Sequence, residues 1–488
     1  MENRRKKVLH VKLYEQTALQ ISERIEKGYF LVGDKLPSIR ELSQSHSVSI
    51  STAQEAYRLL EDQGWAESRP KSGYYVLDRQ NTPLNLPNIT RPSQRPLEVT
   101  HWQEVLNLLC ANYQPDSIQL SRAIPDLDAP SIKPLTKLLA DINRQLPTRD
   151  LLSYETLRGS DKLRLQIARL MVDSGCQLHP DDLVITNGCQ EALSSSLLAL
   201  CKPGDIIAVD SPNFYGSLQI IKALGLKALE IPTHPETGIS LEALELALEQ
   251  WPIKALQITP TCNNPLGYTM PTEHKKKLLA LTKPYDLAII EDDIYGDLAY
   301  QSPRPPSIKS MDEEGRVLYC SSFSKTLAPG LRVGWVAPGR YLNQVMHMKY
   351  VVTASTSTQA QLGIAEFIAQ GGYERHIRKM RQQYQNNRDY LIRLITEHFP
   401  DGTRMSYPLG GFVLWVELPG DIDTVEMNKR AELFNTSIAP GTLFSASGKY
   451  RNCMRLNFAQ RGDERSDKAV EQLGLLAKAM IKEKQTVQ

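Results

Sequence analysis

The sequence lacks the features that would place it in a membrane, a secretory route or a disulfide framework. It contains no run of 18 apolar residues, so no transmembrane helix is expected. The basic stretch at residues 1–7 leads into polar residues rather than an apolar segment, so no secretory signal is expected. Seven cysteines are scattered without a C-x-x-C pair, which favours reduced thiols over disulfides or zinc ligands. We therefore expect a cytoplasmic protein with no metal site.

Neither sign of charge is in large excess over the other. The net charge is +2 over 488 residues, so any DNA-binding site must be local rather than a property of the whole surface. Hydrophobic residues make up 41% and charged residues 23%, which excludes a wholly disordered or fibrous chain. At about 100–200 residues per domain, this length suggests three units.

Composition divides the chain into three regions. Residues 11–78 are dense in helical pattern, and apolar strands alternate with helices over residues 98–480. Between them, residues 79–97 contain four prolines among polar residues. Proline lacks the N–H that a helix needs, so this stretch favours an extended, semi-rigid linker.

The first region follows the order of a winged helix-turn-helix. Apolar residues recur every three or four positions over residues 14–25, as in an amphipathic helix. Ser38, with Glu41 three residues later, forms a capping box that opens a second helix. A third helix starts near Ser49 or Ser51, and two short strands follow as a hairpin. In this α+β plan, the second of the paired helices enters a major groove.

Three segments of this region, residues 33–42, 48–53 and 59–64, resemble the GntR-type DNA-binding domain. The resemblance covers roughly residues 11–77 and implies double-stranded operator DNA as a partner. It implies that residues of the paired helices and of the wing tip meet phosphates or base edges. These residues are Ser38, Arg40, Ser51 and Thr52 on the helices, and Arg69, Lys71 and Gly73 on the wing.

The region departs from the GntR pattern in its charges. Ile50 and Gln54 stand where such domains usually carry arginine. Residues 1–78 hold 12 Lys and Arg against 11 Asp and Glu. Counterion release must therefore come from a few placed cations, and we expect modest affinity helped by dimerisation. The alternative is a small domain that makes protein contacts, with Arg4–Lys7 a solvated tail.

In the large region, polar clusters follow the carboxyl ends of five short apolar strands. The clusters are 187–190, 210–214, 260–267, 291–295 and 321–325. Ligands bind at the carboxyl ends of strands in doubly wound sheets. The glycine turn at Gly188, before an apolar helix, also aims backbone N–H groups at an anion.

These clusters contain Asn-Pro-Leu-Gly at 264–267, Asp-Asp-Ile-Tyr at 292–295 and Ser-Phe-Ser-Lys at 322–325, with Gly-Leu-Arg-Val-Gly-Trp at 330–335. Together they resemble the class I/II aminotransferases of pyridoxal phosphate fold type I. The resemblance implies pyridoxal 5′-phosphate as cofactor and an α/β domain. It also implies a smaller C-terminal α+β subdomain, at about residues 380–480, that closes on the ligand.

The resemblance also implies individual roles at the reactive end of the cofactor. Lys325 would form the Schiff base, because a lysine in a desolvated, cation-rich pocket becomes nucleophilic. Asp292, in preference to Asp293, would face the pyridine nitrogen and keep the ring protonated. Tyr295 and Asn264 would hydrogen-bond the 3′-oxygen.

Other residues would hold the rest of the cofactor and its ligand. Phe214 would stack on the ring, and Tyr154 would reach the phosphate of the neighbouring subunit unless it is an ordinary core or turn tyrosine. Arg455 would grip an α-carboxylate, with a salt bridge as the alternative. The phosphate would be held by Gly188, Cys189, Gln190, Ser322 and Arg332. Ala123 stands where the family usually has glycine, in a segment that covers the substrate side.

A GntR-type domain joined by a proline-rich linker to an aminotransferase-like domain resembles the MocR-like regulators. The resemblance implies a bacterial transcription regulator that works as a homodimer, typically head-to-tail. A small amine or amino-acid effector would displace Lys325 from its aldimine and shift a conformational population. Two alternatives stay open: an active pyridoxal phosphate-dependent aminotransferase that carries a DNA-binding domain, or a repressor whose degenerate pocket is a scaffold. The effector, the operator and the direction of regulation do not follow from the sequence.

Overall fold

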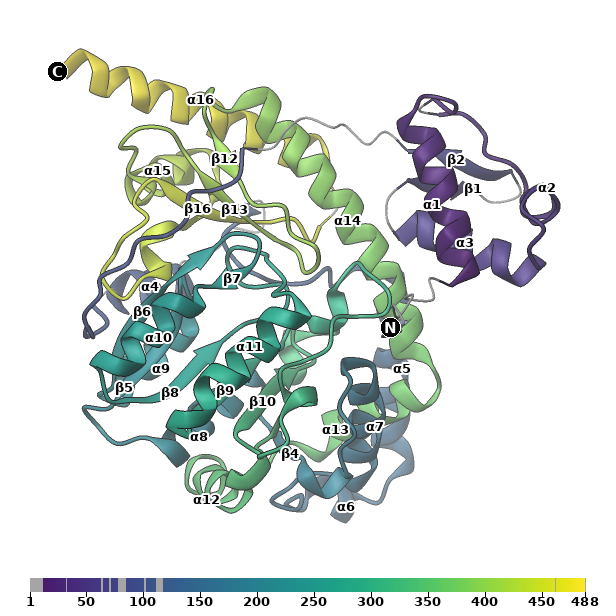
Figure 1. Cartoon of the computed structure of the whole chain (residues 1–488). Coiled ribbons are helices and arrows are strands. Elements are labelled where there is room, and N and C mark those ends of the chain that lie inside the picture. Colours follow the sequence, from purple (N-terminus) through teal and green to yellow (C-terminus); the bar gives the residue numbers. More distant parts are fainter. Residues whose placement is uncertain are drawn as a thin grey trace, which may run out of the picture. The chain divides into compact units, whose positions relative to one another are not determined.

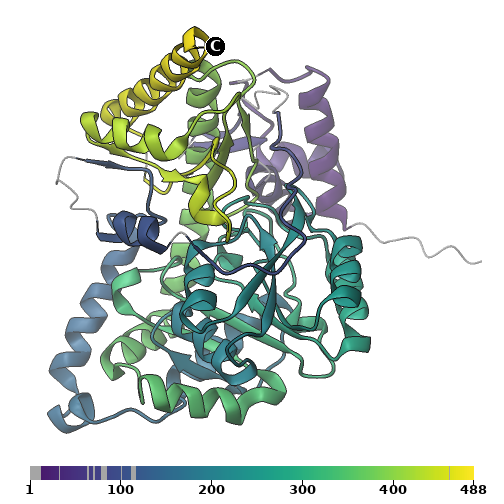
Figure 2. The same cartoon turned by 90° about the vertical axis from the view of Figure 1, so that its left-hand side faces the viewer.

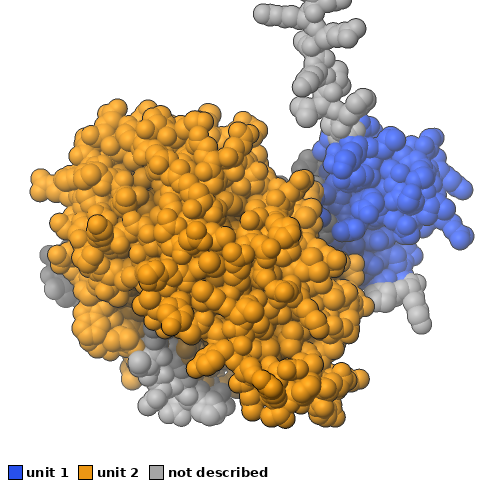
Figure 3. Space-filling model, turned by 90° about the horizontal axis from the view of Figure 1, so that it is seen from below, with its two compact units in different colours: residues 1–83, 300–302 blue, residues 84–299, 303–488 orange. Residues whose placement is uncertain are grey.

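Two units make up the chain in the computed structural model (Figures 1 and 3). Unit 1 comprises residues 1–83 with 300–302, and unit 2 comprises residues 84–299 and 303–488. The structure describes residues 12–31, 33–62, 65–69, 72–77, 85–100, 102–110, 117–460 and 462–487.

Unit 1 is a three-helix domain completed by a two-stranded hairpin. Its elements are α1 (Leu13–Glu26), α2 (Ile39–Ser45), α3 (Ile50–Asp62), β1 (Ala66–Arg69) and β2 (Gly73–Val76). The predicted capping box is present: the Ser38 hydroxyl accepts from the Glu41 N–H at 3.3 Å, and the Glu41 carboxylate accepts from the Ser38 N–H at 2.7 Å. Ser49 caps α3 by accepting from the N–H of Thr52 at 3.1 Å. The winged helix-turn-helix prediction is confirmed.

The core of unit 1 joins the hairpin to the helices. The ring of Tyr57 on α3 stacks on that of Tyr74 on β2, with centroids 4.1 Å apart. The Tyr57 hydroxyl donates to the carbonyl of Pro37, just before α2. Leu42 and Leu60 are fully buried in the same cluster. This packing holds α2 and α3 in a fixed relation, which a helix-turn-helix requires.

Unit 2 is built on an eight-stranded mixed sheet. Its order is β4 (Val184–Thr186), β11 (Gly334–Ala337), β10 (Val317–Ser322), β9 (Ala288–Asp292), β8 (Ile253–Ile258), β5 (Ile206–Ser211), β6 (Lys227–His234) and β7 (Gly238–Ile239). Strands β10, β9, β8, β5 and β6 are parallel, whereas β11 runs antiparallel to both β10 and β4. The predicted α/β architecture is confirmed.

Alternate residues of these strands enter two separate cores. Ala208, Leu256 and Ile289 face one cluster, and their neighbours Val209 and Ile290 face the other. The period-two alternation of a strand makes a sheet that is apolar on both faces, so helices cover both. These helices are α8 (Cys189–Leu200), α9 (Tyr215–Ala223) and α12 (Leu342–Val352) on one face, and α10 (Leu241–Gln250) and α11 (Thr272–Thr282) on the other (Figure 1).

A further group of helices packs beside this sheet and leads out of it. They are α5 (Lys133–Gln145), α6 (Thr148–Leu152), α7 (Asp161–Met171), α13 (Thr358–Ala369) and the 27-residue α14 (Gly372–His398). Helix α14 connects the eight-stranded sheet to a second, smaller sheet, as Figures 1 and 2 show.

The smaller sheet forms an α+β subdomain at the C-terminal end of the chain. Its order is β12 (Arg404–Met405), β13 (Val413–Glu417), β16 (Cys453–Asn457) and β15 (Ala439–Pro440). It is accompanied by α15 (Thr424–Ala431), α16 (Glu464–Val487), α4 (Trp102–Cys110) and the pair β3 (Ile118–Gln119) and β14 (Thr436–Ser437). Among the described helices, none combines the length and the apolar character needed to cross a bilayer.

The described part of the proline-rich segment, residues 85–97, is attached to unit 2. The Asn88 side chain and N–H both donate to the carboxylate of Glu417, at 2.6 and 2.9 Å. Thr90 accepts from the N–H of Thr233 at 2.8 Å, and residue 97 pairs with residue 228 of β6. The segment therefore contacts both the smaller sheet and the edge of the larger one.

Candidate cofactor and DNA-binding sites

The five predicted polar clusters follow five strands of the large sheet that all run in the same direction. Across β9 and β10, Asp292 pairs with Cys320. Ser322, at the end of β10, pairs with Gly334 of β11, which in turn pairs with Thr186 at the end of β4. Because parallel strands end at the same edge, the side chains beyond these positions gather there.

Lys325 lies three residues beyond β10 and is half-buried. Its Nζ donates to the carbonyl of Ala123, so the alanine found in place of glycine still permits close backbone approach. Burial, followed by the guanidinium groups of Arg455 and Arg332, lowers the pKa of Lys325 to about 8, against the opposing pull of Asp292. An amine in this range carries a substantial neutral, nucleophilic fraction near pH 7.

Strand β9 ends at Asp292 and Asp293 follows it, and the structure gives these two carboxylates different partners. Asp293 is paired: its Oδ2 accepts from Arg304 and, at 2.6 Å, from the hydroxyl of Tyr319. Asp292 is buried and has the thiol of Cys189 as a weak donor at 3.5 Å. Burial raises the pKa of Asp292 to about 7. A buried carboxylate without a cationic partner suits a protonated ring nitrogen.

The hydroxyl of Tyr295 is a buried polar group. It has no hydrogen-bond partner within the described ranges, although the ring packs edge-on to Phe412 at 5.4 Å. Leaving a buried hydroxyl unsatisfied costs roughly 1–3 kcal/mol. Burial also raises the pKa of Tyr295, so the group stays a donor. This donor fits the 3′-oxygen of pyridoxal phosphate.

Arg455 is the largest side chain with no exposed surface. Its Nη1 donates to Oδ1 of Asn264 at 3.1 Å, and its Nη2 donates to the carbonyl of Ser121. Its Nε has no partner among the described residues, and the guanidinium lies 5.1 Å from the ring centroid of Phe444. A buried guanidinium without a carboxylate is suited to bind one from a ligand.

The turn before α8 forms the predicted phosphate end of the site. Gly188 has φ +82°, and a Cβ there would lie 2.7 Å from Nη2 of Arg332. That Nη2 donates to the carbonyl of Asn187 at 2.9 Å. Helix α8 begins at Cys189, so its first-turn N–H groups have no acceptor within the helix. The exposed Arg332 and these N–H groups together present the donors that an anion requires.

Three further predicted residues lie beside this turn. Gln190 is exposed, and its amide donates to the carbonyl of Gly216 at 3.0 Å. Ser322 is buried and accepts from the N–H of Ser324 at 3.2 Å. Phe214 is half-buried, with its ring centroid 4.7 Å from that of Tyr215. The sequence argument missed Ser324, whose buried hydroxyl has no partner among the described residues.

Sequence reasoning also missed Asp210, at the end of β5. Its fully buried carboxylate accepts from Nδ2 of Asn213, from Nδ2 of Asn263 at 2.7 Å and from the Tyr268 hydroxyl at 2.8 Å. Burial raises the pKa of Asp210 to about 6. The network fixes the turn that presents Asn264. The signal available in the sequence was a carboxylate, Asp210, at the end of a predicted strand and three residues before Asn213.

Tyr154 faces solvent in the single chain, with 90% of its surface exposed. It lines a hollow of about 310 Å³ together with residues 355–359. Leu152, on the same wall, is 74% exposed. Exposed large apolar side chains that cluster in this way are typical of a contact surface.

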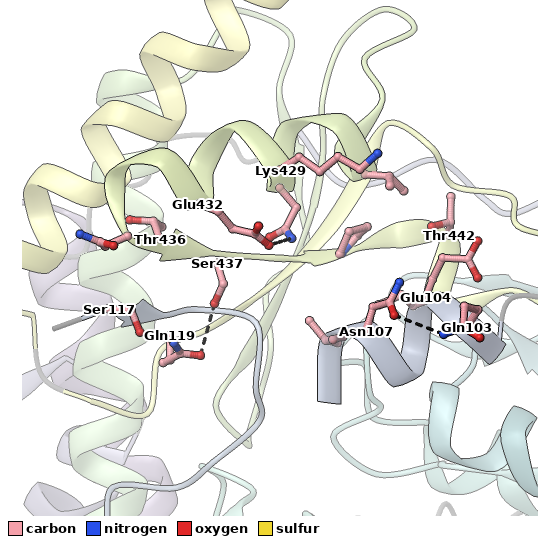
Figure 4. Close-up of a pocket in the computed structure, with 16 residues that line it drawn as sticks. Gln103, Glu104, Asn107, Ser117, Gln119, Lys429, Glu432, Thr436, Ser437 and Thr442 are labelled. Atoms are coloured by element: carbon pink, nitrogen blue, oxygen red, sulfur yellow. Dashed lines mark hydrogen bonds between the residues drawn. The ribbon is translucent and has the colours of Figure 1, made fainter. Parts of the chain in front are cut away.

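A separate cavity of about 730 Å³ lies between α4, β3 and α15, and Figure 4 shows its polar lining. Glu432, directly after α15, accepts from Asn428 of α15 at 3.0 Å, and Ser437 donates to Gln119 at 3.3 Å. None of the predicted cofactor or effector residues lines this cavity. It is therefore distinct from the site at the strand ends.

On the helices of unit 1, the predicted DNA-binding side chains are at the surface or close to it. Arg40 and Ser51 are exposed, and Thr52 is half-buried. The hydroxyls of Ser51 and Thr52 both contact that of Ser49, at 2.7 and 2.8 Å. Ser38 uses its oxygen as a cap acceptor, which leaves its hydroxyl hydrogen available for a phosphate.

Arg69 is the one Lys or Arg among the described residues of the wing, the hairpin of β1 and β2. Arg69 pairs with Glu67 at 2.7 Å and stacks 4.2 Å above the ring of Tyr75. Gly73 follows the turn with φ +113°, a conformation that side chains disfavour. Lys71 lies outside the described residues.

Each of the two units matches a known protein family. A family model described as aminotransferase class I and II matches residues 115–473, and one described as bacterial regulatory proteins, gntR family, matches residues 13–76. The chain belongs to the MocR-like regulators. In this MocR-like chain, a GntR-type helix-turn-helix precedes a class I/II aminotransferase domain, whose fold implies a pyridoxal phosphate cofactor.

Relatives of the MocR-like chain cover nearly its whole length or its aminotransferase domain. YjiR of Escherichia coli, named an uncharacterized HTH-type transcriptional regulator, is 50% identical and covers 94% of this chain and 98% of its own. The multiple substrate aminotransferase of Thermococcus profundus is 30% identical with a TM-score of 0.71, over 79% of this chain and 96% of its own. LysN of Thermus thermophilus, solved with N-(5′-phosphopyridoxyl)-L-leucine, is 25% identical with a TM-score of 0.70, over 79% and 96%.

Proposed function

We propose that this MocR-like regulator binds pyridoxal phosphate on Lys325 and senses a small amine or amino acid there. The observation that carries the proposal is the half-buried Lys325 amine with its pKa lowered to about 8, at the strand ends where the carboxylate of Asp292 is buried. Bound pyridoxal phosphate supplies an aldehyde that condenses with primary amines and a ring that draws electrons when its nitrogen is protonated.

Residues of the chain would divide the work of binding. Lys325 supplies the neutral amine, and Asp292 holds a proton at the ring nitrogen. Tyr295 and Asn264 hydrogen-bond the 3′-oxygen, and Phe214 covers the ring. The phosphate contacts come from Ser322, Arg332 and the backbone of Gly188, Cys189 and Gln190.

Arg455 gives the site its selectivity for amino acids. It lies on β16 of the smaller sheet, whereas Lys325 and Asp292 follow strands of the larger sheet. A ligand with both an amine and a carboxylate would therefore bridge the two sheets and favour their closed arrangement. This differential affinity is the source of a population shift that reaches the DNA-binding unit.

The proposal includes a homodimer, head-to-tail, that binds operator DNA. The exposure of Tyr154 supports it, since the resemblance implies that this tyrosine contacts the phosphate of the neighbouring subunit. Similarity to YjiR supports the regulatory half, and the phosphopyridoxyl-leucine bound by LysN supports an amino-acid ligand.

Spectroscopy and operator binding in parallel test the proposal. Purified protein is titrated with pyridoxal phosphate and then with a panel of amines and amino acids. Operator affinity is measured under the same conditions. We expect a visible absorbance band that depends on Lys325, is altered by one class of amine, and changes together with operator affinity. Operator binding that is the same under all these conditions would overturn the sensing proposal.

A second candidate function is an active aminotransferase that carries a DNA-binding domain. The observation that favours it is the complete set of groups at the strand ends, including the buried Arg455. Steady-state transamination against a panel of amino acids decides between the two functions. Turnover at rates typical of metabolic enzymes, about 1–1,000 per second, would establish the second.

A further inference from the structure

A buried ion pair lies behind the phosphate end of the site. Lys349 on α12 approaches Oε1 of Glu191 on α8 at 3.3 Å, and their side chains are 0% and 6% exposed. The two residues are 158 positions apart in the chain. Neither belongs to the set expected to touch the cofactor.

Glu191 connects this pair to the turn before α8. Its Oε2 accepts from the backbone N–H of Asn187 and, at 2.9 Å, from the Asn187 side-chain amide. Two bonds to one residue fix the orientation of the adjoining peptide groups. The carbonyl of the same Asn187 accepts from Arg332 at 2.9 Å. The path Lys349–Glu191–Asn187–Arg332 is therefore continuous.

The hydrogen bonds around Glu191 are those of a carboxylate that accepts at both oxygens. Only the ionised carboxylate accepts at both oxygens, whereas a protonated one would turn an acceptor into a donor. Lys349 pairs with Oε1 of this carboxylate, and the hydroxyl of Thr353 also donates to Oε1. Lys349 in turn donates to Thr356 at 3.1 Å, so its own ammonium has further acceptors.

Charge balance gives the pair a second effect. Glu191 occupies the first turn of α8, where an anionic phosphate would also bind. A carboxylate there repels a phosphate unless a cation compensates it. Lys349 is that cation, and it is buried enough to act without solvent screening.

We propose that Glu191 and Lys349 are a positioning pair that orients the Asn187 turn and Arg332 for the cofactor phosphate and cancels the repulsion of that phosphate by Glu191. This inference rests on the proposed function, because it concerns the phosphate of the same cofactor. The competing explanation is that the pair only anchors α12 to α8. That explanation predicts no preference for a ligand with a phosphate.

Two compounds that carry the same aldehyde but differ in their phosphate distinguish between these explanations. Pyridoxal 5′-phosphate and pyridoxal both condense with Lys325, but only the first has a phosphate. In full-length Lys349→Met, we expect affinity for pyridoxal phosphate to fall by about tenfold or more while affinity for pyridoxal stays within about twofold. The double variant Glu191→Gln with Lys349→Met is neutral at both positions and should recover the part of the loss that comes from uncompensated charge.

Lys275→Met is the matched control. Lys275 is also fully buried, but it donates to Thr261 at 3.1 Å and to the carbonyl of Pro306 at 2.7 Å rather than toward the phosphate turn. Its loss should leave the ratio of the two affinities unchanged. Circular dichroism and Tm report whether each variant folds.

The outcomes are distinct. Equal losses for both probes in Lys349→Met, or no loss for either, would overturn the positioning role. A double variant that binds pyridoxal phosphate no better than Lys349→Met would overturn the charge balance. A native chain that binds neither probe would contradict the proposed function itself, not the pair.

Discussion

The predicted DNA-binding side chains of unit 1 and the most deeply buried predicted ligand-binding side chains of unit 2 lie in opposite environments. In unit 1, Arg40 and Ser51 are exposed, and the hydroxyl contacts of Ser51 stay within one helical turn. In unit 2, Arg455 has no exposed surface, and Tyr295 is buried with no hydrogen-bond partner among the described residues.

The difference shows which kind of site a structure reveals by itself. Water satisfies an exposed polar group at little cost, so exposure alone does not mark a binding surface. A buried polar group without a partner is costly, and proteins keep few of them. The unpartnered hydroxyl of Tyr295 therefore marks a position suited to ligand binding, whereas the expected role of Arg40 rests on the resemblance of unit 1 to other DNA-binding domains.

Removing the reactive amine is the strongest test of the buried site. In Lys325→Ala, we expect complete loss of the visible absorbance that pyridoxal phosphate produces, and of any covalent adduct in the mass spectrum. Lys325→Arg keeps a cation of similar length without a nucleophilic amine, and it should behave in the same way. An adduct that survives in either variant would place the reactive amine elsewhere.

Changing the ligand end of the same site should have the next largest effect. We expect Arg455→Met to weaken the spectral response to amino acids by roughly 100-fold, since losing a charged hydrogen-bond partner costs about 2–3 kcal/mol. Amines that match those amino acids but lack the carboxylate should respond equally in both proteins. Titrations with each matched pair measure the difference, and equal losses for the two ligands would contradict the carboxylate role.

The pH dependence of Lys325 sharpens the comparison further. Its lowered pKa of about 8 predicts that the rate of reaction with pyridoxal rises about tenfold from pH 7 to pH 9 and then levels. The sign follows from the neutral amine, whose fraction grows as pH passes the pKa. An ordinary lysine would continue to gain rate beyond pH 10. Stopped-flow absorbance across this range measures the midpoint.

The exposed site of unit 1 should show the smallest change. We expect Arg40→Ala to lower operator affinity by about fivefold and to reduce the slope of log affinity against log salt by about one, because one phosphate contact is lost. Arg58→Ala is the control, since Arg58 on α3 pairs with Glu55 at 3.4 Å and is not expected to contact DNA. Equal effects of the two substitutions would contradict a specific role for Arg40.

Local features of both units could be predicted because their causes are local. The capping box of Ser38 and Glu41 depends on residues three apart, and the structure contains it. The clusters after β9 and β10 could be predicted because an apolar run followed by polar residues marks the end of a buried strand. Because these strands were expected to run parallel, the clusters at their carboxyl ends were expected to meet at one edge of the sheet.

The long-range pairings could not be predicted from the sequence. Arg455 reaches Asn264 across 191 positions and Ser121 across 334. The choice between Asp292 and Asp293 also depends on a distant side chain, because Arg304 pairs with the second. No spacing rule identifies such partners, since they meet only after the sheets have packed.

By itself, the sequence determined the helices, the strand ends and the resemblance of two regions to known families, because short-range periodicity and capping chemistry decide these features. The tertiary structure alone decided which polar atoms are buried without partners, which carboxylate is neutralised by an arginine, and which lysine balances Glu191. These are properties of desolvation and of distance in space, and both arise only when remote segments exclude water together.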